Sequence, residues 1–277
     1  MRQIKILLLT ALCIVSVLFA GTKYMRIHSG KDIPPVIECS QEVLDISVLQ
    51  DEAVLLTGMS ASDEQDGDLT GQIMVGGISK LISDNTAKVT YMVFDSDDNM
   101  ATYVRTIRYI DYHRPRIEVS SALNFSRDET LGIISHLRVE DVVDGDISDK
   151  IRISTLRVTD DSNIFTVVAQ VTNSLGDSAK QELYVVLMDT DPDRPVIYLS
   201  EYLTHVEQGS HFEPKSYVQS VSATRKGMPT SDVYWQSNVD TSVPGTYWVK
   251  YYYTSDGNTG LTMMTVVVEP TGGAGIE

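Results

Sequence analysis

One short pattern, a proline followed by β-forming residues, occurs three times: Pro35-Val36-Ile37-Glu38, Pro115-Arg116-Ile117-Glu118 and Pro195-Val196-Ile197-Tyr198. The three prolines stand 80 residues apart. A fixed period of this length indicates tandem copies of one structural unit. The 277 residues therefore predict several small domains of similar fold after an N-terminal segment, each with a core of modest size.

The residues between the prolines predict an all-β fold. Short runs rich in Val, Ile, Thr and Tyr are interrupted by Gly, Asp, Asn or Pro at roughly every 8 to 12 positions. The first unit closes with a run from Val89 to Phe94, a polar turn and a run from Ala101 to Ile110, and the later units close in the same way. Each unit is therefore expected to be a β-sandwich of about seven strands.

A second shared pattern reads D-x-x-D-G-D, followed by an aliphatic residue and a hydroxyl. Its aspartates are Asp63, Asp66 and Asp68 in the first unit, and Asp141, Asp144 and Asp146 in the second. Closely spaced carboxylates on one loop suit a hard cation, and calcium is the candidate cofactor. Alternatively, the side chains cap loop N–H groups while Gly67 and Gly145 adopt a positive φ. Both interpretations stay open at this point.

These motifs carry a family resemblance. The opening Pro34-Pro35-Val36-Ile37, the acidic pattern, and Val243-Pro244-Gly245-Thr246-Tyr247 leading to Asp256-Gly257-Asn258 resemble the bacterial immunoglobulin-like repeat of unknown function. That family also occurs in a pesticidal crystal protein and is similar in pattern to hyalin repeats. The resemblance covers about residues 32 to 269 and implies an extracellular, non-enzymatic β-sandwich of surface and adhesion-type proteins. The third unit departs from it, with Thr224-Arg225-Lys226-Gly227-Met228 in place of the acidic pattern.

The predicted organisation is three tandem immunoglobulin-like β-sandwich domains after one N-terminal transmembrane or signal helix. The expected segments are 1–31 (signal anchor and juxtamembrane segment), 32–112 (first repeat), 113–191 (second repeat), 192–270 (third repeat) and 271–277 (flexible tail). Because the connections between repeats are short, the modules are expected to form a semi-extended string with limited bending.

The N-terminal segment has the pattern of an export signal. Arg2 and Lys5 precede the uncharged run from Ile6 to Gly21. The site for cleavage near Ala20 is poor, since Leu18 stands where a small residue is preferred. An uncleaved single-pass anchor in the cell membrane, with the C-terminal region outside, is therefore favoured; if the signal is cleaved, the protein is secreted.

Composition excludes some classes of function. A net charge of −16 repels phosphate backbones, so nucleic acid is not an expected partner. The two cysteines, one inside the apolar run, allow no disulfide within the exported part. The sequence has no nucleophile elbow, no phosphate-binding Gly loop and no zinc-ligand spacing, and we expect no enzymatic activity.

Aromatic residues distinguish the third repeat. Tyr247, Tyr251 and Tyr253 alternate along one run with Trp248 and Tyr252, so the two sets should face opposite sides of a sheet. One set must fill the core. The outward set forms the candidate partner-binding residues Trp248 and Tyr252, together with Trp235. Packing of this set against a neighbouring strand or module is the alternative.

The leading functional hypothesis is a membrane-anchored stalk or adhesion-type module whose aromatic-rich third repeat binds an extracellular protein or carbohydrate. The first alternative is a structural or regulatory cell-envelope component that packs on membrane partners. The second alternative is an accessory part of an exported enzyme.

Overall fold

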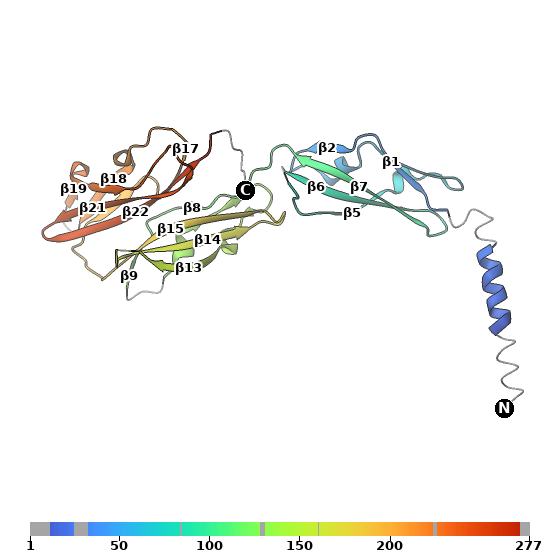
Figure 1. Cartoon of the computed structure of the whole chain (residues 1–277), viewed down its shortest axis with the longest axis horizontal. Helices are drawn as coiled ribbons and strands as arrows, with labels where there is room; N and C mark the ends of the chain where they lie inside the picture. Colours follow the sequence, from blue (N-terminus) through green and yellow to red (C-terminus); the bar gives the residue numbers. More distant parts are fainter. Residues whose placement is uncertain are drawn as a thin grey trace, which may run out of the picture. The chain divides into compact units, whose positions relative to one another are not determined.

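The computed structural model describes residues 12–24, 33–83, 85–127, 131–159, 161–223 and 226–271 (Figure 1). The chain divides into two compact units, Met1–Tyr112 and His113–Glu277. The first contains the first repeat, and the second contains the second and third repeats. The tail expected at 271–277 lies outside the described residues, apart from Thr271.

Residues 12–24 form a helix, drawn in blue in Figure 1. Its apolar side chains, among them Leu12, Val17 and Phe19, are exposed. Within the described part of the chain, no helix is both long and apolar enough to cross a membrane. The predicted span begins at Ile6, and residues 6–11 lie outside the described residues.

The first repeat is built from two sheets, with strand orders β1-β3-β4 and β2-β7-β6-β5. The strands are β1 (Val36–Cys39), β2 (Val43–Ile46), β3 (Met59–Asp63), β4 (Gly67–Asp68), β5 (Met74–Ile78), β6 (Thr86–Phe94) and β7 (Met100–Tyr109). Short 3-10 turns lie at Glu52–Leu56 and Thr70–Gln72. The β-branched and aromatic runs of the sequence thus form the long strands, and the acidic pattern forms the short hairpin β3-β4.

Alternation along β6 creates the core of the first repeat. Ala87, Val89, Tyr91 and Val93 are fully buried, while the residues between them face the other side of the sheet. The Tyr91 hydroxyl donates to the Leu55 carbonyl at 2.7 Å, so its one polar atom is satisfied inside the core.

The second repeat contains the sheets β10-β8, β11-β12 and β13-β14-β15-β9. Its strands are β8 (Glu118–Val119), β9 (Asn124–Ser126), β10 (Leu137–Arg138), β11 (Glu140–Asp141), β12 (Gly145–Asp146), β13 (Arg152–Val158), β14 (Ile164–Thr172) and β15 (Ser178–Met188). Its 3-10 turns lie at Ile133–His136 and Ser148–Lys150. Buried residues from opposite sheets, such as Leu137 and Leu183, share one hydrophobic cluster, which makes the arrangement sandwich-like.

The third repeat contains the sheets β16-β18-β19 and β17-β22-β21-β20. Its strands are β16 (Val196–Leu199), β17 (Leu203–Glu207), β18 (Val218–Ala223), β19 (Lys226–Met228), β20 (Tyr234–Ser237), β21 (Gly245–Ser255) and β22 (Asn258–Glu269). Its 3-10 turns lie at Pro214–Tyr217 and Thr230–Asp232. Ile197 and Val221 of one sheet pack with Tyr251 and Met264 of the other.

A parallel strand pair recurs in all three repeats. The pairs are β2 with β7, β9 with β15 and β17 with β22. In each repeat the chain therefore leaves the sheet of its opening strand and joins the opposite sheet beside the last strand. Sequence reasoning did not anticipate this pairing, because β9 is only Asn124–Ser126 and such short runs carry no pattern of their own.

The second and third repeats pack directly on each other, and Figure 1 shows β15 beside β22. Ile164 and Val186 of the second repeat form one buried cluster with Leu261 and Met263 of the third. The Asn124 side-chain amide donates to the Leu261 carbonyl at 2.9 Å. The expectation of a semi-extended string is therefore wrong for these two repeats, because each carries apolar residues on an outer sheet face that only the other repeat covers.

Candidate functional site

In the first repeat the acidic pattern is a hydrogen-bonded loop. Asp63 Oδ1 accepts from the main-chain N–H groups of Gln65 and Asp66 at 2.7 and 3.1 Å. Asp68 Oδ1 accepts from the N–H of Thr70 at 2.9 Å, and hydrogen bonding from Thr70 holds the pKa of Asp68 below its ordinary value. Gly67 has φ +75°, a conformation that a residue without Cβ adopts at little cost.

In the second repeat the loop repeats this geometry. Asp141 Oδ1 accepts from the N–H groups of Val143 and Asp144 at 2.9 and 3.0 Å. Asp146 Oδ1 accepts from the Ser148 hydroxyl at 2.6 Å and from the Ser148 N–H at 2.9 Å, and these hydrogen bonds, the hydroxyl's first, lower the pKa of Asp146. Gly145, like its counterpart, has a positive φ of +71°.

The middle aspartate of each pattern joins the loop to the last hairpin turn of its repeat. Asp66 accepts from both the N–H and the hydroxyl of Ser96, at 2.7 and 2.8 Å. Asp144 accepts from the N–H of Ser174 at 2.7 Å and from Lys150 Nζ at 3.3 Å. The contacts with Ser96 and Ser174 connect residues 30 positions apart in the chain, so the acidic pattern stabilises the end of the sandwich.

In the part of the chain that the structure describes, no group of three or more His, Cys, Asp or Glu side chains is placed to hold a metal ion. The capping interpretation accounts for the hydrogen bonds of these loops, and calcium stays a hypothesis that one measurement tests. We expect the same melting temperature in calcium and in chelator, because Asp63 and Asp141 already accept main-chain donors. A metal that binds only the folded state would raise the melting temperature, and a rise lost in Asp66→Asn would contradict this expectation.

Acidification should weaken the second repeat through Asp144. Hydrogen bonding from Ser174 is the largest cause that holds the pKa of Asp144 below its ordinary value, and Lys150 adds to it. A carboxyl with a lowered folded-state pKa stabilises the fold above the unfolded pKa, about 3.9, and loses that contribution as the pH falls further. Between about pH 5 and pH 2, urea unfolding midpoints should therefore fall more steeply for the natural protein than for Asp144→Asn. Parallel curves would show that the contacts of Asp144 with Ser174 and Lys150 add no charge-dependent stability.

Along β21 the side chains alternate between the core and the outer face of the sheet, as the sequence predicted. Val249, Tyr251 and Tyr253 are buried in the core of the third repeat. The Tyr251 hydroxyl donates to the Pro214 carbonyl at 2.8 Å, and burial is the main cause that raises the pKa of Tyr251. Trp248 and Tyr252 occupy the opposite face and are half-buried.

Trp248 belongs to the contact between repeats. Its side chain packs on the buried cluster that joins the second and third repeats. Next to it on the same face, Lys250 Nζ lies 2.6 Å from Asp161 Oδ2 of the second repeat. Packing against a neighbouring module, the alternative considered for these aromatics, is thus the observed role of Trp248.

The three candidate partner-binding aromatics do not form one platform. In the antiparallel register Trp235 pairs with the inward-facing Tyr251, and Tyr234 pairs with the outward-facing Tyr252. Trp235 therefore lies on the core side of an edge strand, across the sheet from Trp248 and Tyr252. The aromatic that accompanies Tyr252 is Tyr234, whose ring is stacked on it with centroids 5.8 Å apart and whose side chain is well exposed.

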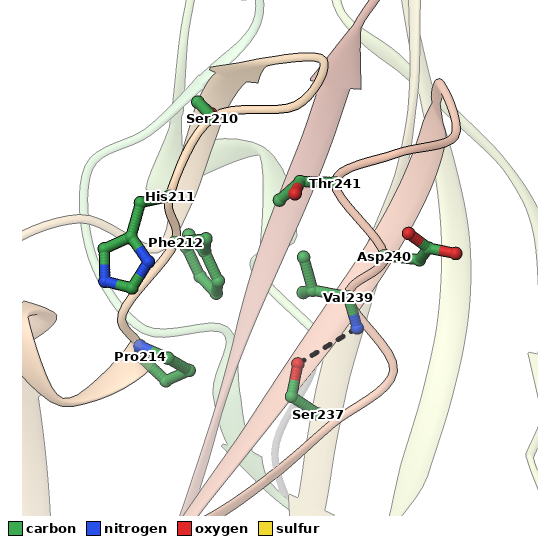
Figure 2. A pocket seen from close by; sticks show the side chains of 8 residues that line it. All are labelled: Ser210, His211, Phe212, Pro214, Ser237, Val239, Asp240 and Thr241. Atoms are coloured by element: carbon green, nitrogen blue, oxygen red, sulfur yellow. Dashed lines mark hydrogen bonds between the residues drawn. The ribbon is translucent and has the colours of Figure 1, made fainter.

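An open pocket of about 470 Å³ lies elsewhere in the third repeat (Figure 2). It is formed by two loops, one after β17 and one after β20. Its lining residues are Ser210, His211, Phe212, Pro214, Ser237, Val239, Asp240 and Thr241. Sequence reasoning missed this pocket, because its two halves lie far apart in the chain and carry no motif. The sequence indicated only that a binding site should lie in the third repeat.

The two loops of the pocket are held together by hydrogen bonds to main-chain carbonyl groups. The Gly209 N–H donates to the Thr241 carbonyl at 2.7 Å, and the Gln208 side chain donates to the Ser242 carbonyl at 2.7 Å. Gly209 has φ +80°, which allows the tight turn after β17. The pocket is therefore a built part of the repeat and does not depend on an unanchored loop.

The inner surface of the pocket combines apolar and hydroxyl groups. Figure 2 shows Phe212, Val239 and Thr241 pointing into the space between the loops, while the Asp240 carboxylate points away from it. Asp240 accepts from the Ser242 N–H and hydroxyl, and this hydrogen bonding lowers its pKa. The Phe212 ring packs beside Tyr217, 5.5 Å between centroids. Such a surface suits a neutral ligand with both C–H faces and hydroxyl groups.

No family model matches the sequence, and no curated protein matches it. Among solved structures, the M60 catalytic domain with the CBM51-1 and CBM51-2 domains of Clostridium perfringens ZmpB is similar at 15% identity and TM-score 0.25, covering 86% of this chain and 31% of that one. The protocadherin gammaB4 extracellular domain is similar at 14% identity and TM-score 0.19, over 86% of this chain and 50% of that one. Drosophila N-cadherin EC1-4 is similar at 11% identity and TM-score 0.22, over 85% and 75%. The chain thus spans about a third of the length of the first of these proteins.

Proposed function

We propose that this chain is a non-enzymatic bacterial surface protein of tandem immunoglobulin-like sandwiches, in which the third repeat binds a carbohydrate or protein partner at its pocket. The observation that supports the proposal most is the pocket between the loops after β17 and β20. Pockets of this volume take small ligands, and they use a few placed polar groups on an apolar surface. The first and second repeats then serve as a support that carries the third repeat.

A neutral carbohydrate is the ligand that the pocket chemistry favours. A sugar ring presents C–H groups on its faces and hydroxyl groups at its edge. The Phe212 ring and Val239 offer apolar surface for the C–H faces, and the Thr241 hydroxyl can pair with the hydroxyl groups. The His211 ring lies on the outer side of its loop, at the edge of the pocket (Figure 2). The outward carboxylate of Asp240 leaves the interior of the pocket without a charge that would select an ion.

Export is part of the proposal and rests on the N-terminal sequence. The basic Arg2 and Lys5 followed by the run from Ile6 to Gly21 support translocation, with the chain retained at the membrane as a single-pass anchor. Fractionation of cells tests this directly: intact protein is expected in the membrane fraction. Recovery of a shortened protein from the medium would replace the anchor by a cleaved signal, and recovery in the cytoplasm would remove export altogether.

Ligand binding is tested by presenting the folded full chain to a glycan array and, in parallel, to solubilised cell envelope. Retention on a defined set of glycans supports carbohydrate recognition. Retention of only membrane proteins favours the alternative of a structural or regulatory envelope component, and it would contradict a carbohydrate pocket.

A further inference from the structure

Part of one outer sheet face of the first repeat is uncharged and largely apolar. On β5, β6 and β7 the residues between the buried ones face outward in paired rows. These residues, which we call the methionine face, are Met74, Thr90, Met92, Phe94, Met100, Thr102 and Val104. Met74, Met100 and Val104 are 48%, 52% and 53% exposed. Contiguous apolar surface of this kind marks interaction sites, and methionine adapts its shape to a partner.

A glycine makes room for Met92 in the methionine face. A Cβ added to Gly76 would stand 2.4 Å from the Met92 terminal methyl, so Met92 lies across the backbone of β5 where a side chain would otherwise stand. The strand has a register irregularity at the same place, between Val75 and Gly77. Met92 thus occupies the place that a side chain at position 76 would take, next to Met74 on the paired strand.

The same face is covered in the third repeat. There the outward rows nearest the last hairpin turn contain Leu261 and Met263, which are only 9% and 6% exposed. The second repeat covers them with its own outward sheet residues, such as Val186. In the third repeat this part of the face is therefore buried against the second repeat, which contributes residues from the end of β14 and β15 away from its last hairpin turn, whereas in the first repeat the face is exposed.

Charges at the two ends of the methionine face are opposite in sign. Asp98 is exposed in the hairpin turn that joins β6 to β7, beyond Phe94 and Met100. Lys88 is exposed at the other end, roughly 20 Å from Phe94 along the strand, and the ion pair of Arg108 with Asp45 lies beyond it. Two such faces related by a two-fold axis near Met92 and Thr102 would bring each Lys88 close to the Asp98 of the other copy. The face is self-complementary, which is the requirement for an isologous contact.

We propose that two copies of this chain pair through the methionine face of the first repeat. A second copy is the partner that fits, because an uncharged face with one acidic and one basic end matches itself when it is rotated by a half-turn. The net charge of −16 opposes other contacts between copies, so approach through this uncharged surface is the favoured mode. The dimer places two third-repeat pockets on one assembly, and avidity follows if both bind.

The contact is tested by cysteine cross-linking in cells that express the full chain. With Cys13 and Cys39 replaced by serine, Thr102→Cys near the axis should give a covalent dimer with a short bismaleimide. Ser60→Cys is the matched control, since it is an exposed polar strand residue on the outer face of the opposite sheet. Equal dimer yields from Ser60→Cys and Thr102→Cys, or no dimer from Thr102→Cys, would overturn the proposal.

Substitutions in the face test its chemistry. In the Thr102→Cys background, Val104→Lys should abolish the dimer, because it places a charge in the apolar centre. Lys88→Glu should weaken dimerisation about tenfold, equivalent to about 1.4 kcal/mol, and Lys88→Glu with Asp98→Lys should restore it. Melting curves of the variants confirm folding. A dimer insensitive to both Val104→Lys and Lys88→Glu in folded protein would show that another surface joins the copies.

Discussion

Replacement of Gly260 by alanine should lower the free energy of unfolding of the C-terminal unit by about 3 kcal/mol or more. A Cβ at Gly260 would stand 1.9 Å from the carbonyl oxygen of Pro195 and 2.8 Å from its carbonyl carbon. Both atoms are backbone, so the clash cannot be relieved by a side-chain rotation. The opening strand of the third repeat or β22 would have to move, and β22 also carries the residues buried against the second repeat.

The measurement is urea unfolding followed by tryptophan fluorescence. Both tryptophans of the protein, Trp235 and Trp248, lie in the third repeat, so the signal reports this unit selectively. Gly245→Ala is the matched control: Gly245 is also a strand glycine of the third repeat, but an added Cβ would meet only Tyr247 side-chain atoms, at 3.5 Å or more. The control should leave the transition unchanged. An unchanged midpoint for Gly260→Ala would show that Pro195 and β22 do not approach this closely.

Replacement of Arg105 by alanine should destabilise the N-terminal unit by about 3 kcal/mol. Arg105 is a 1% exposed residue of β7, and its side chain donates to the Gln41 carbonyl at 2.8 Å and to the Thr57 carbonyl at 2.7 Å. These carbonyls lie just before β2 and just after the 3-10 turn Glu52–Leu56. The guanidinium therefore ties together the segments through which the chain passes between the two sheets.

A second substitution separates packing from hydrogen bonding at this position. In the other repeats the matching inward positions of the last strand are Leu183 and Met264. Arg105→Met should fill the space but leave the two carbonyls without their donor, at a cost of about 1 to 2 kcal/mol. Calorimetry of the N-terminal unit's transition measures both variants. An Arg105→Met protein more stable than the natural one would mean that the cost of burying the charge exceeds its two hydrogen bonds.

The sequence predicts those features of the structure that are determined by residues close together in the chain. The β-rich character follows from strand and turn residues that act within a few positions. The facing of Tyr251 and Trp248 follows from alternation alone. The capping role of Asp63 and Asp141 was one of two open interpretations, because the carboxylate spacing suits both a cation and loop N–H groups.

What the sequence did not predict depends on contacts between distant segments. Trp248 is covered by residues of the second repeat, and no residue near Trp248 in the sequence indicates this contact. Trp235 was grouped with Trp248 on composition, whereas the register of β20 against β21 places it on the other side of the sheet. Arg105 stands where the other repeats have apolar residues, and its role depends on two carbonyls more than 40 positions away.

The location of the binding site is the central claim, and one comparison tests it. On the glycans or envelope proteins that retain the natural chain, Thr241→Val removes a pocket hydroxyl with little change of shape, and His211→Ala removes an exposed ring at the edge of the pocket. Thr246→Val is the matched control, an exposed threonine of the third repeat outside the pocket, and Tyr252→Ala tests the outward aromatic face. We predict that retention falls about tenfold or more in both pocket variants and stays unchanged in the other two. Loss of retention in Tyr252→Ala with full retention in the pocket variants would contradict the pocket and return the site to the aromatic face.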